Sequence, residues 1–159
     1  MTTDISGQQI TLMSRFHILG SDRPLTVPNS WLVSVRPDGS VGFISIGELR
    51  TAPDNPQVPC SINRQFSESD YAMENLDLPR SEMHSALTNA GLFDDEATAM
   101  LATWEQAYFQ SAGLRLFHVV PRAWTETRLP LTVSVDADIT RVMMGRIELV
   151  SDCSLLRPS

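Results

Sequence analysis

The sequence predicts an α+β domain with a mainly antiparallel β-sheet and a two-helix hairpin packed on one face of that sheet. Strand-like runs come first, at Ser30–Arg36 and Val41–Ile46. Two helical patterns follow, at Leu78–Gly91 and Phe93–Gly113, and strand-like runs return from Leu114 onward. Because strands and helices are segregated along the chain instead of alternating, an antiparallel α+β arrangement is favoured over a parallel α/β one.

Length and composition indicate a single domain over residues 1–159. The chain has 159 residues, of which 42% are hydrophobic, so it can bury a sizeable core but would be cramped as two domains. Residues 1–9 and 151–159 are predicted to be loose tails. Residues 51–70 contain three prolines and no hydrophobic period, which predicts a long irregular Pro-rich connection.

The first strands are predicted from residue alternation. Ile10–Leu19 has the composition of a strand with a mixed pattern. In the next run Trp31, Val33 and Val35 alternate with polar residues, which is typical of a half-buried strand. The turn sequence Pro37–Ser40 (PDGS) joins this run to the next, so the two runs are predicted to form a β-hairpin.

The two helices are predicted from stripes of apolar residues. The first stripe has i, i+3, i+4, i+7 spacing and consists of Met83, Ala86, Leu87 and Ala90. Gly91 follows where a helix-ending glycine is favoured. Asp94 is the candidate N-cap of the second helix. The stripe of that helix consists of Ala97, Met100, Leu101, Trp104 and Tyr108.

Three further strands are predicted, at Leu114–Val120, Leu129–Val135 and Ile139–Val150. Gly145, inside the third, is predicted to mark a bulge or a close approach of another group. Between the first two runs, Pro121 is expected to end a strand and to begin a corner. Trp124 is expected to plug the edge of the core at that corner, since a large aromatic side chain is buried or stacked.

The net charge of −7 is concentrated between Phe66 and Glu96, where eight acidic residues face a single Arg. This balance disfavours binding to nucleic acid, which needs a basic face, and attachment to an anionic membrane surface. An acidic window of this kind is usually a solvated face that keeps a protein soluble. It could also dock a basic protein partner. The candidate contacts for such a partner are Glu68, Asp70, Glu74 and Asp77.

Motifs for the common catalytic and cofactor sites are absent from the sequence. All twelve basic residues are Arg, so neither a Schiff-base Lys nor a P-loop Lys exists. No GxSxG, GxGxxG or HExxH is present. Cys60 and Cys153 do not have metal-ligand spacing, and two independent thiols are favoured over a disulfide. We therefore predict no catalytic residue, no cofactor and no metal site.

Two candidate sites remain, both near the predicted corner. Arg122, Trp124 and Arg128 could form a patch that recognises a carboxylate or a peptide, because guanidinium forks bind carboxylates and stack on rings. Alternatively, the chain is a hydrolase-type enzyme with a site around His118, Arg122 and Cys60. Against this, a histidine within a strand is usually a satisfied residue at the face of the sheet.

Three stretches carry a resemblance: AGLFDDEATAMLATW, GLRLFHVVPRAWTETRLPL and RVMMGRIELV. Together, over residues 87–150, the chain resembles the C-terminal module of a group of uncharacterised bacterial proteins. In that group an acidic helix ending in Thr-Trp leads to a strand, a VPR corner, an LPL run and a closing GR-E strand. The resemblance implies a module without catalytic features, often in an envelope setting.

The sequence therefore favours a non-catalytic, protein-binding accessory or assembly subunit of a larger bacterial complex. No run of residues approaches the length of a membrane span. The first residues, MTTDISGQQ, have neither a basic region nor an apolar core of a signal peptide, which predicts a cytoplasmic protein. A periplasmic or envelope location is the alternative if the chain is a trimmed or mature form.

Overall fold

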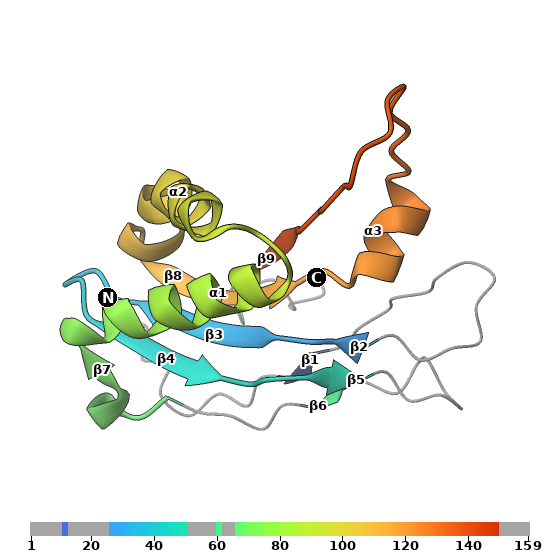
Figure 1. Ribbon diagram of the computed structural model, residues 1–159. Coiled ribbons are helices and arrows are strands. Elements are labelled where there is room, and N and C mark those ends of the chain that lie inside the picture. Colours follow the sequence, from blue (N-terminus) through green and yellow to red (C-terminus); the bar gives the residue numbers. More distant parts are fainter. Residues whose placement is uncertain (1–10, 13–25, 51–59, 62–65, 150–159) are drawn as a thin grey trace, which may run out of the picture.

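The computed structural model describes residues 11–12, 26–50, 60–61 and 66–149. Its centre is a five-stranded antiparallel sheet with the strand order β7-β4-β3-β8-β9 (Figure 1). The strands are β3 (Ser30–Val35), β4 (Val41–Ser45), β7 (Tyr71–Ala72), β8 (Gly113–Val119) and β9 (Met144–Leu149). Two helices contact each other on one face of the sheet, so the predicted α+β class is confirmed.

Four short strands form two small pairings outside this sheet. β1 (Thr11–Leu12) pairs with β6 (Cys60–Ser61). β2 (Thr26–Val27) pairs with β5 (Leu49–Arg50). Of the predicted strand at residues 10–19 only β1 is described, and most of the predicted irregular connection at 51–70 lies outside the described residues, as do both predicted tails.

The predicted hairpin is β3–β4. The N–H of Arg36 donates to the carbonyl of Ser40, and that of Gly39 to the carbonyl of Arg36, both over 2.9 Å. Gly39 has a φ of +87°, a conformation that a residue without Cβ adopts without steric cost. The hairpin is therefore closed by the residues of the PDGS turn.

Strand β3 was expected to be half-buried, but all six of its residues are buried. The reason is its position, since β3 pairs with β4 along one edge and with β8 along the other. Its Trp31, Val33 and Val35 belong to the main core on the helix side. The opposite face of the sheet carries a second cluster made of Leu32, Phe66, Leu114 and Leu116.

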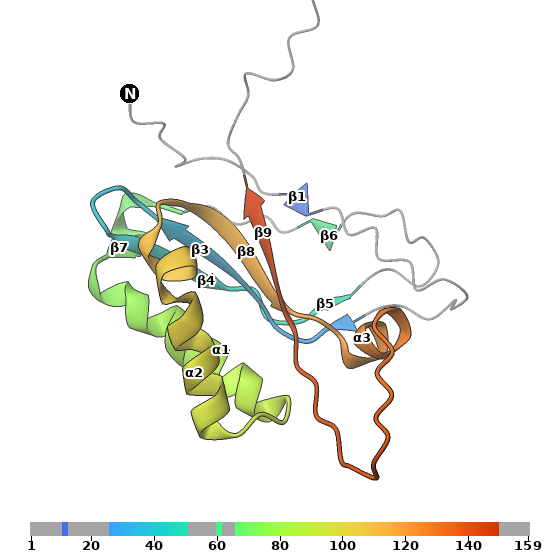
Figure 2. The same cartoon turned by 90° about the horizontal axis from the view of Figure 1, so that it is seen from above.

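The two predicted helices are α1 (Asp77–Asn89) and α2 (Asp94–Glu105), and both lie on the same side of the sheet (Figures 1 and 2). Two short 3₁₀ turns, η1 (Glu68–Asp70) and η2 (Glu74–Leu76), lead into α1. Gly91 ends α1 as predicted, with a φ of +111°, and the N–H of Leu92 donates to the carbonyl of Leu87 over 3.2 Å.

The second helix differs from the prediction at both ends. Phe93, not Asp94, precedes its first turn, because the carboxylate of Glu96 accepts the N–H of Phe93 over 2.9 Å. At the other end, α2 continues as the π-helical turn η3 (Gln106–Gln110). The wider turn shifts the apolar stripe, so that Phe109 is buried in the core and Tyr108 only partly so.

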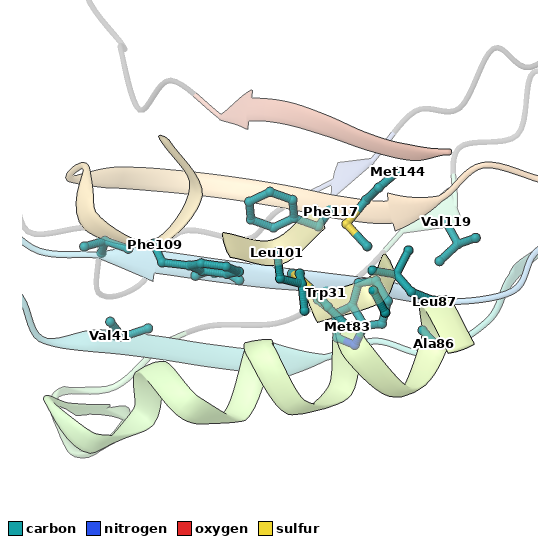
Figure 3. Close-up of a cluster of buried hydrophobic side chains, with 13 residues drawn as sticks. Trp31, Val41, Met83, Ala86, Leu87, Leu101, Phe109, Phe117, Val119 and Met144 are labelled. Atoms are coloured by element: carbon teal, nitrogen blue, oxygen red, sulfur yellow. The ribbon is translucent and has the colours of Figure 1, made fainter. Parts of the chain in front are cut away.

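The main core lies between the helices and the sheet, and Figure 3 shows its side chains. Phe117 of β8 is completely buried there, and its ring centroid lies 4.8 Å from that of Tyr108 and 6.4 Å from that of Phe109. The indole N–H of Trp31 donates to the carboxylate of Glu82 over 2.9 Å. This hydrogen bond ties α1 to the sheet beside the apolar contacts.

The predicted strand–corner–strand region is wrong in its detail. Residues 122–128 form a short helix, α3 (Arg122–Arg128), because the carbonyl of Pro121 accepts the N–H groups of Trp124 (3.0 Å) and Thr125 (3.1 Å). Trp124 is half-buried and belongs to neither core cluster, so it is not the predicted core plug. The buried residue of α3 is Thr125.

The two strands predicted after this corner are also changed. Leu129–Val135 is in no sheet, and the predicted strand Ile139–Val150 begins only at Met144, as β9. Pro130 follows the end of α3 by two residues and lacks the N–H that a ladder needs, and residues 131–143 pair with no described strand. None of the helices in the described residues is long and apolar enough to cross a membrane.

Candidate functional site

Residues 129–143, which we call the arm, are the most exposed apolar feature of the described chain. The arm leaves the body at the end of α3, extends away from it and returns to the start of β9 (Figures 1 and 2). Leu129, Leu131, Val133 and Val135 are exposed by 44%, 54%, 42% and 68%. Because they occupy every second position, they would share one face if the segment paired as a strand.

The arm is attached to the body only near its two ends. The N–H of Leu129 donates to Thr125 at the end of α3 (2.9 Å), and the carbonyl of Met143 accepts the N–H of Val120 (2.8 Å). Between these points no backbone group of residues 130–142 bonds to another described backbone group. The side chain of Arg141 bridges the two legs, donating to the carbonyl of Leu129 over 2.6 Å. The arm therefore has the composition of a strand without the pairing of one.

A cleft with a volume of about 220 Å³ lies between α3 and the arm. Its walls are formed by Arg122, Glu126, Pro130, Leu131, Ile139 and Arg141. Arg122 donates to Glu126 over 2.6 Å across one turn of α3, and both side chains are more than half exposed. The two arginines are thus already held by Glu126 and by a carbonyl, which leaves a mixed apolar and ion-paired surface.

The proposed carboxylate-binding residues do not form one surface. On α3, Trp124 and Arg128 are four residues apart and share a face, whereas Arg122 shares a different face with Glu126. Of the three, only Arg122 lines the cleft. A binding role for Arg122, Trp124 and Arg128 remains a prediction from the sequence.

Several acidic residues of the predicted docking window have partners within the fold. Glu68 accepts both terminal nitrogens of Arg36, over 2.8 and 2.6 Å, and this guanidinium lies 3.5 Å from the centroid of the Tyr71 ring. Asp70 accepts the N–H of Ser67 over 2.6 Å, a bond that lowers the pKa of the Asp70 carboxyl. These contacts hold η1 against the sheet.

The remaining acidic residues divide into two groups. Asp77 pairs with Arg80 over 3.0 Å, and Arg80 also pairs with Glu105 of α2. Glu74 is exposed, and so are Asp94 and Asp95, which follow Phe93, a side chain that is 75% exposed. Seven of the eight acidic residues of the window are nevertheless exposed, all except Asp70, and the docking role of the window stays a prediction.

The residues of the alternative enzyme site lie in different settings. His118 of β8 is buried on the sheet face opposite the helices and packs against Gly145 of β9. Arg122 lines the cleft, whose described walls do not include His118. Cys60 is in β6, and its side chain lies outside the described residues. Among the described residues, no three His, Cys, Asp or Glu side chains come together as candidate metal ligands.

Stability is expected to decrease as the pH falls through the ordinary pKa of His118. Burial lowers the pKa of His118 below its ordinary value of 6.5, so the unfolded chain binds the proton more readily than the folded chain. This contribution to stability is present above pH 6.5 and is lost below it. Urea midpoints of the wild type and of His118→Gln, compared at about pH 8 and about pH 5.5, measure the effect. An equal loss in both proteins would contradict it.

No protein-family model, curated protein or solved structure matches this chain. The resemblance over residues 87–150 therefore remains a prediction. In the structure that range runs from the end of α1 through α2, β8, α3 and the arm to β9. The function of this range is therefore inferred from the geometry of these elements.

Proposed function

We propose that this chain is a non-catalytic, protein-binding accessory subunit of a larger bacterial assembly, and that the arm is its docking element. The observation that carries the proposal is the row of four exposed apolar side chains on a segment without backbone partners among the described residues. Exposed apolar patches on soluble domains mark interaction sites. The proposal assigns the expected protein partner to the arm.

Burial of the arm supplies the driving force for association. Fully burying one Leu or Val side chain contributes about 1.5–3 kcal/mol relative to leaving it exposed. The four arm side chains are about half exposed, so a partner that covers them gains a substantial part of this amount from each. Backbone N–H and C=O groups of residues 130–142 add main-chain hydrogen bonds if the partner offers a strand.

The body of the protein supports such a role because its core contacts with the arm come only from the second leg, where Val142 packs against the main core. Both core clusters form without any residue between Leu129 and Ile139, and the arm is fixed to the body at Leu129 and Met143. Docking through the arm therefore leaves the sheet and the two helices unchanged. Variants within the arm are expected to fold, which makes the proposal accessible to mutation.

The test is capture of protein partners by arm variants of the tagged full-length chain. Leu131→Asp/Val133→Asp places two charges on the apolar positions and is expected to abolish capture of partners from an extract of the source organism. Thr132→Asp/Ser134→Asp adds the same charge at exposed positions between and beside them, and is expected to retain capture. Bound proteins are identified by mass spectrometry, and thermal unfolding confirms that all three chains are folded.

Two outcomes would contradict the proposal: capture of the same proteins by both variants, or capture of none by the wild type. Repeating the wash at high salt distinguishes binding through the arm from binding through the acidic window. Apolar contacts are not screened by salt, whereas docking of a basic partner on Glu74, Asp94 and Asp95 weakens as salt rises. Retention at high salt is expected if the arm is the main contact.

A further inference from the structure

The edge strand β9 has the properties of an acceptor for another strand. It is the last strand of the five-stranded sheet, and no described strand pairs with its outer edge. It is six residues long, and its Ile147 is 42% exposed. An edge of this length with unpaired N–H and C=O groups is a template for pairing with a further strand.

The first leg of the arm cannot reach this edge within its own chain. The arm turns back at its tip, so its second leg, residues 139–143, is the part that leads directly into β9. A fold-back of the first leg would place it beside that second leg, not beside the outer edge of β9. In the structure the side chain of Arg141 bridges the two legs by donating to the carbonyl of Leu129.

The two faces of β9 match the two sides of the first leg. Arg146 and Glu148 lie on the helix side, where the guanidinium of Arg146 is 5.1 Å from the centroid of the Tyr108 ring and Glu148 pairs with Arg115. Ile147 and Leu149 alternate with them on the opposite side. The leg likewise alternates apolar residues, at odd positions, with polar ones at Thr132, Ser134 and Asp136.

An antiparallel arrangement can lay the leg along the whole of β9. In the register that places Leu129–Ser134 along Leu149–Met144, Leu131 comes beside Ile147, and the apolar residues of the leg share the face of Ile147 and Leu149. Antiparallel pairing also matches the order within the existing sheet.

We propose that the partner docked by the arm is a second copy of this chain, and that two copies exchange arms, each placing residues 129–135 antiparallel on the β9 edge of the other. A two-fold axis produces both pairings at once, which closes the assembly as a dimer and doubles the buried surface. This inference rests on the proposed docking role of the arm. It identifies the surface that the arm binds as the β9 edge of a second copy of the chain.

The mass of the purified full-length chain in solution tests the exchange. Light scattering after size exclusion, with reductant present so that Cys60 and Cys153 do not cross-link copies, is expected to give twice the 17.7 kDa of one chain at high concentration. The arm variant Leu131→Asp/Val133→Asp and the edge variant Ile147→Asp are each expected to be monomers. If Ile147→Asp does not fold, Ile147→Ser is the milder edge variant.

Mixing the two variants distinguishes arm exchange from any other dimer. The arm variant keeps an intact β9 edge and the edge variant keeps an intact arm, so a mixed pair regains one of the two pairings. Association between differently tagged copies is therefore expected in the mixture although neither variant dimerises alone. A dimer that survives both variants, or a mixture without association, would overturn the exchange.

The outcomes separate this inference from the proposed function. A wild type that is monomeric at all concentrations, but captures a different protein through its arm, overturns the exchange and leaves the docking role intact. A monomer that shows no arm-dependent capture overturns both. A dimer lost in the arm variant and restored by mixing supports both.

Discussion

Replacing Phe117 with Ala is expected to lower the free energy of unfolding by about 3–5 kcal/mol. Phe117 is completely buried at the centre of the main core. Its ring lies between the aromatic residues of η3 and the sheet, with centroids 4.8 Å from Tyr108 and 6.4 Å from Phe109. Truncation removes the transfer free energy of the ring and leaves a cavity between α2 and β8. Urea unfolding followed by tryptophan fluorescence and circular dichroism measures the loss.

Trp124→Ala is the matched control for this substitution. Trp124 is a large aromatic residue seven positions further along the chain, but it is half-buried and outside both core clusters. Its loss is expected to cost less than about 2 kcal/mol. Equal losses for the two variants would show that α3 contributes to the main core as much as β8 does, against the packing described above.

Replacing Gly145 with Ala is expected to destabilise the protein by about 1–3 kcal/mol, a typical cost of overpacking. Gly145 faces His118 across the β8–β9 pair, and a Cβ added there would overlap with the His118 ring. The ring is buried, so it has little room to move. Gly145 has no positive φ, and the cost is therefore one of space and not of backbone conformation.

A double-mutant cycle isolates this contact. In the background His118→Ala the obstructing ring is absent, so adding Gly145→Ala is expected to cost much less than it does in the wild type. The coupling free energy is expected to be about 0.5–3 kcal/mol, as for residues in direct contact. Additive effects of the two substitutions would show that the ring does not limit the space at Gly145. Equilibrium unfolding in urea gives all four free energies.

Gly145 also shows how far sequence reasoning extends into this fold. A glycine inside a strand-like run predicted a bulge or a close approach, and the structure shows the close approach without a bulge, since His118 and Gly145 form a regular pair. The glycine itself indicated only that another group lies close to position 145. Only the register of β8 on β9 identifies the neighbour as His118, because that register is set by contacts between residues far apart in the chain.

The candidate site was less predictable than the fold. Leu129–Val135 has the alternation of a strand, which predicts a place in the sheet. Alternation reports which residues share a face but not whether an edge is available to pair with. In the structure β9 takes the position next to β8, and the arm remains outside. The proposed docking role of the arm rests on this same pattern, left without a backbone partner among the described residues.

The acidic window illustrates a similar limit. Its charge was evident from the sequence. Which acids have partners within the fold depends on residues brought in from elsewhere, such as Arg36 for Glu68 and Trp31 for Glu82. Those partners are separated from the acids by 32 and 51 residues. Sequence patterns that extend over a few residues cannot predict pairs so far apart in the chain.

The sequence by itself determined the α+β class, the β3–β4 hairpin and the two-helix layer. Each of these follows from local alternation, turn residues and helical periodicity, which act within a few residues. The tertiary structure decided that β3 is central and buried on both faces, that residues 122–128 form a helix and that the arm has no place in the sheet. These outcomes depend on which strand edges and apolar faces meet, and that competition is settled only when distant segments pack together.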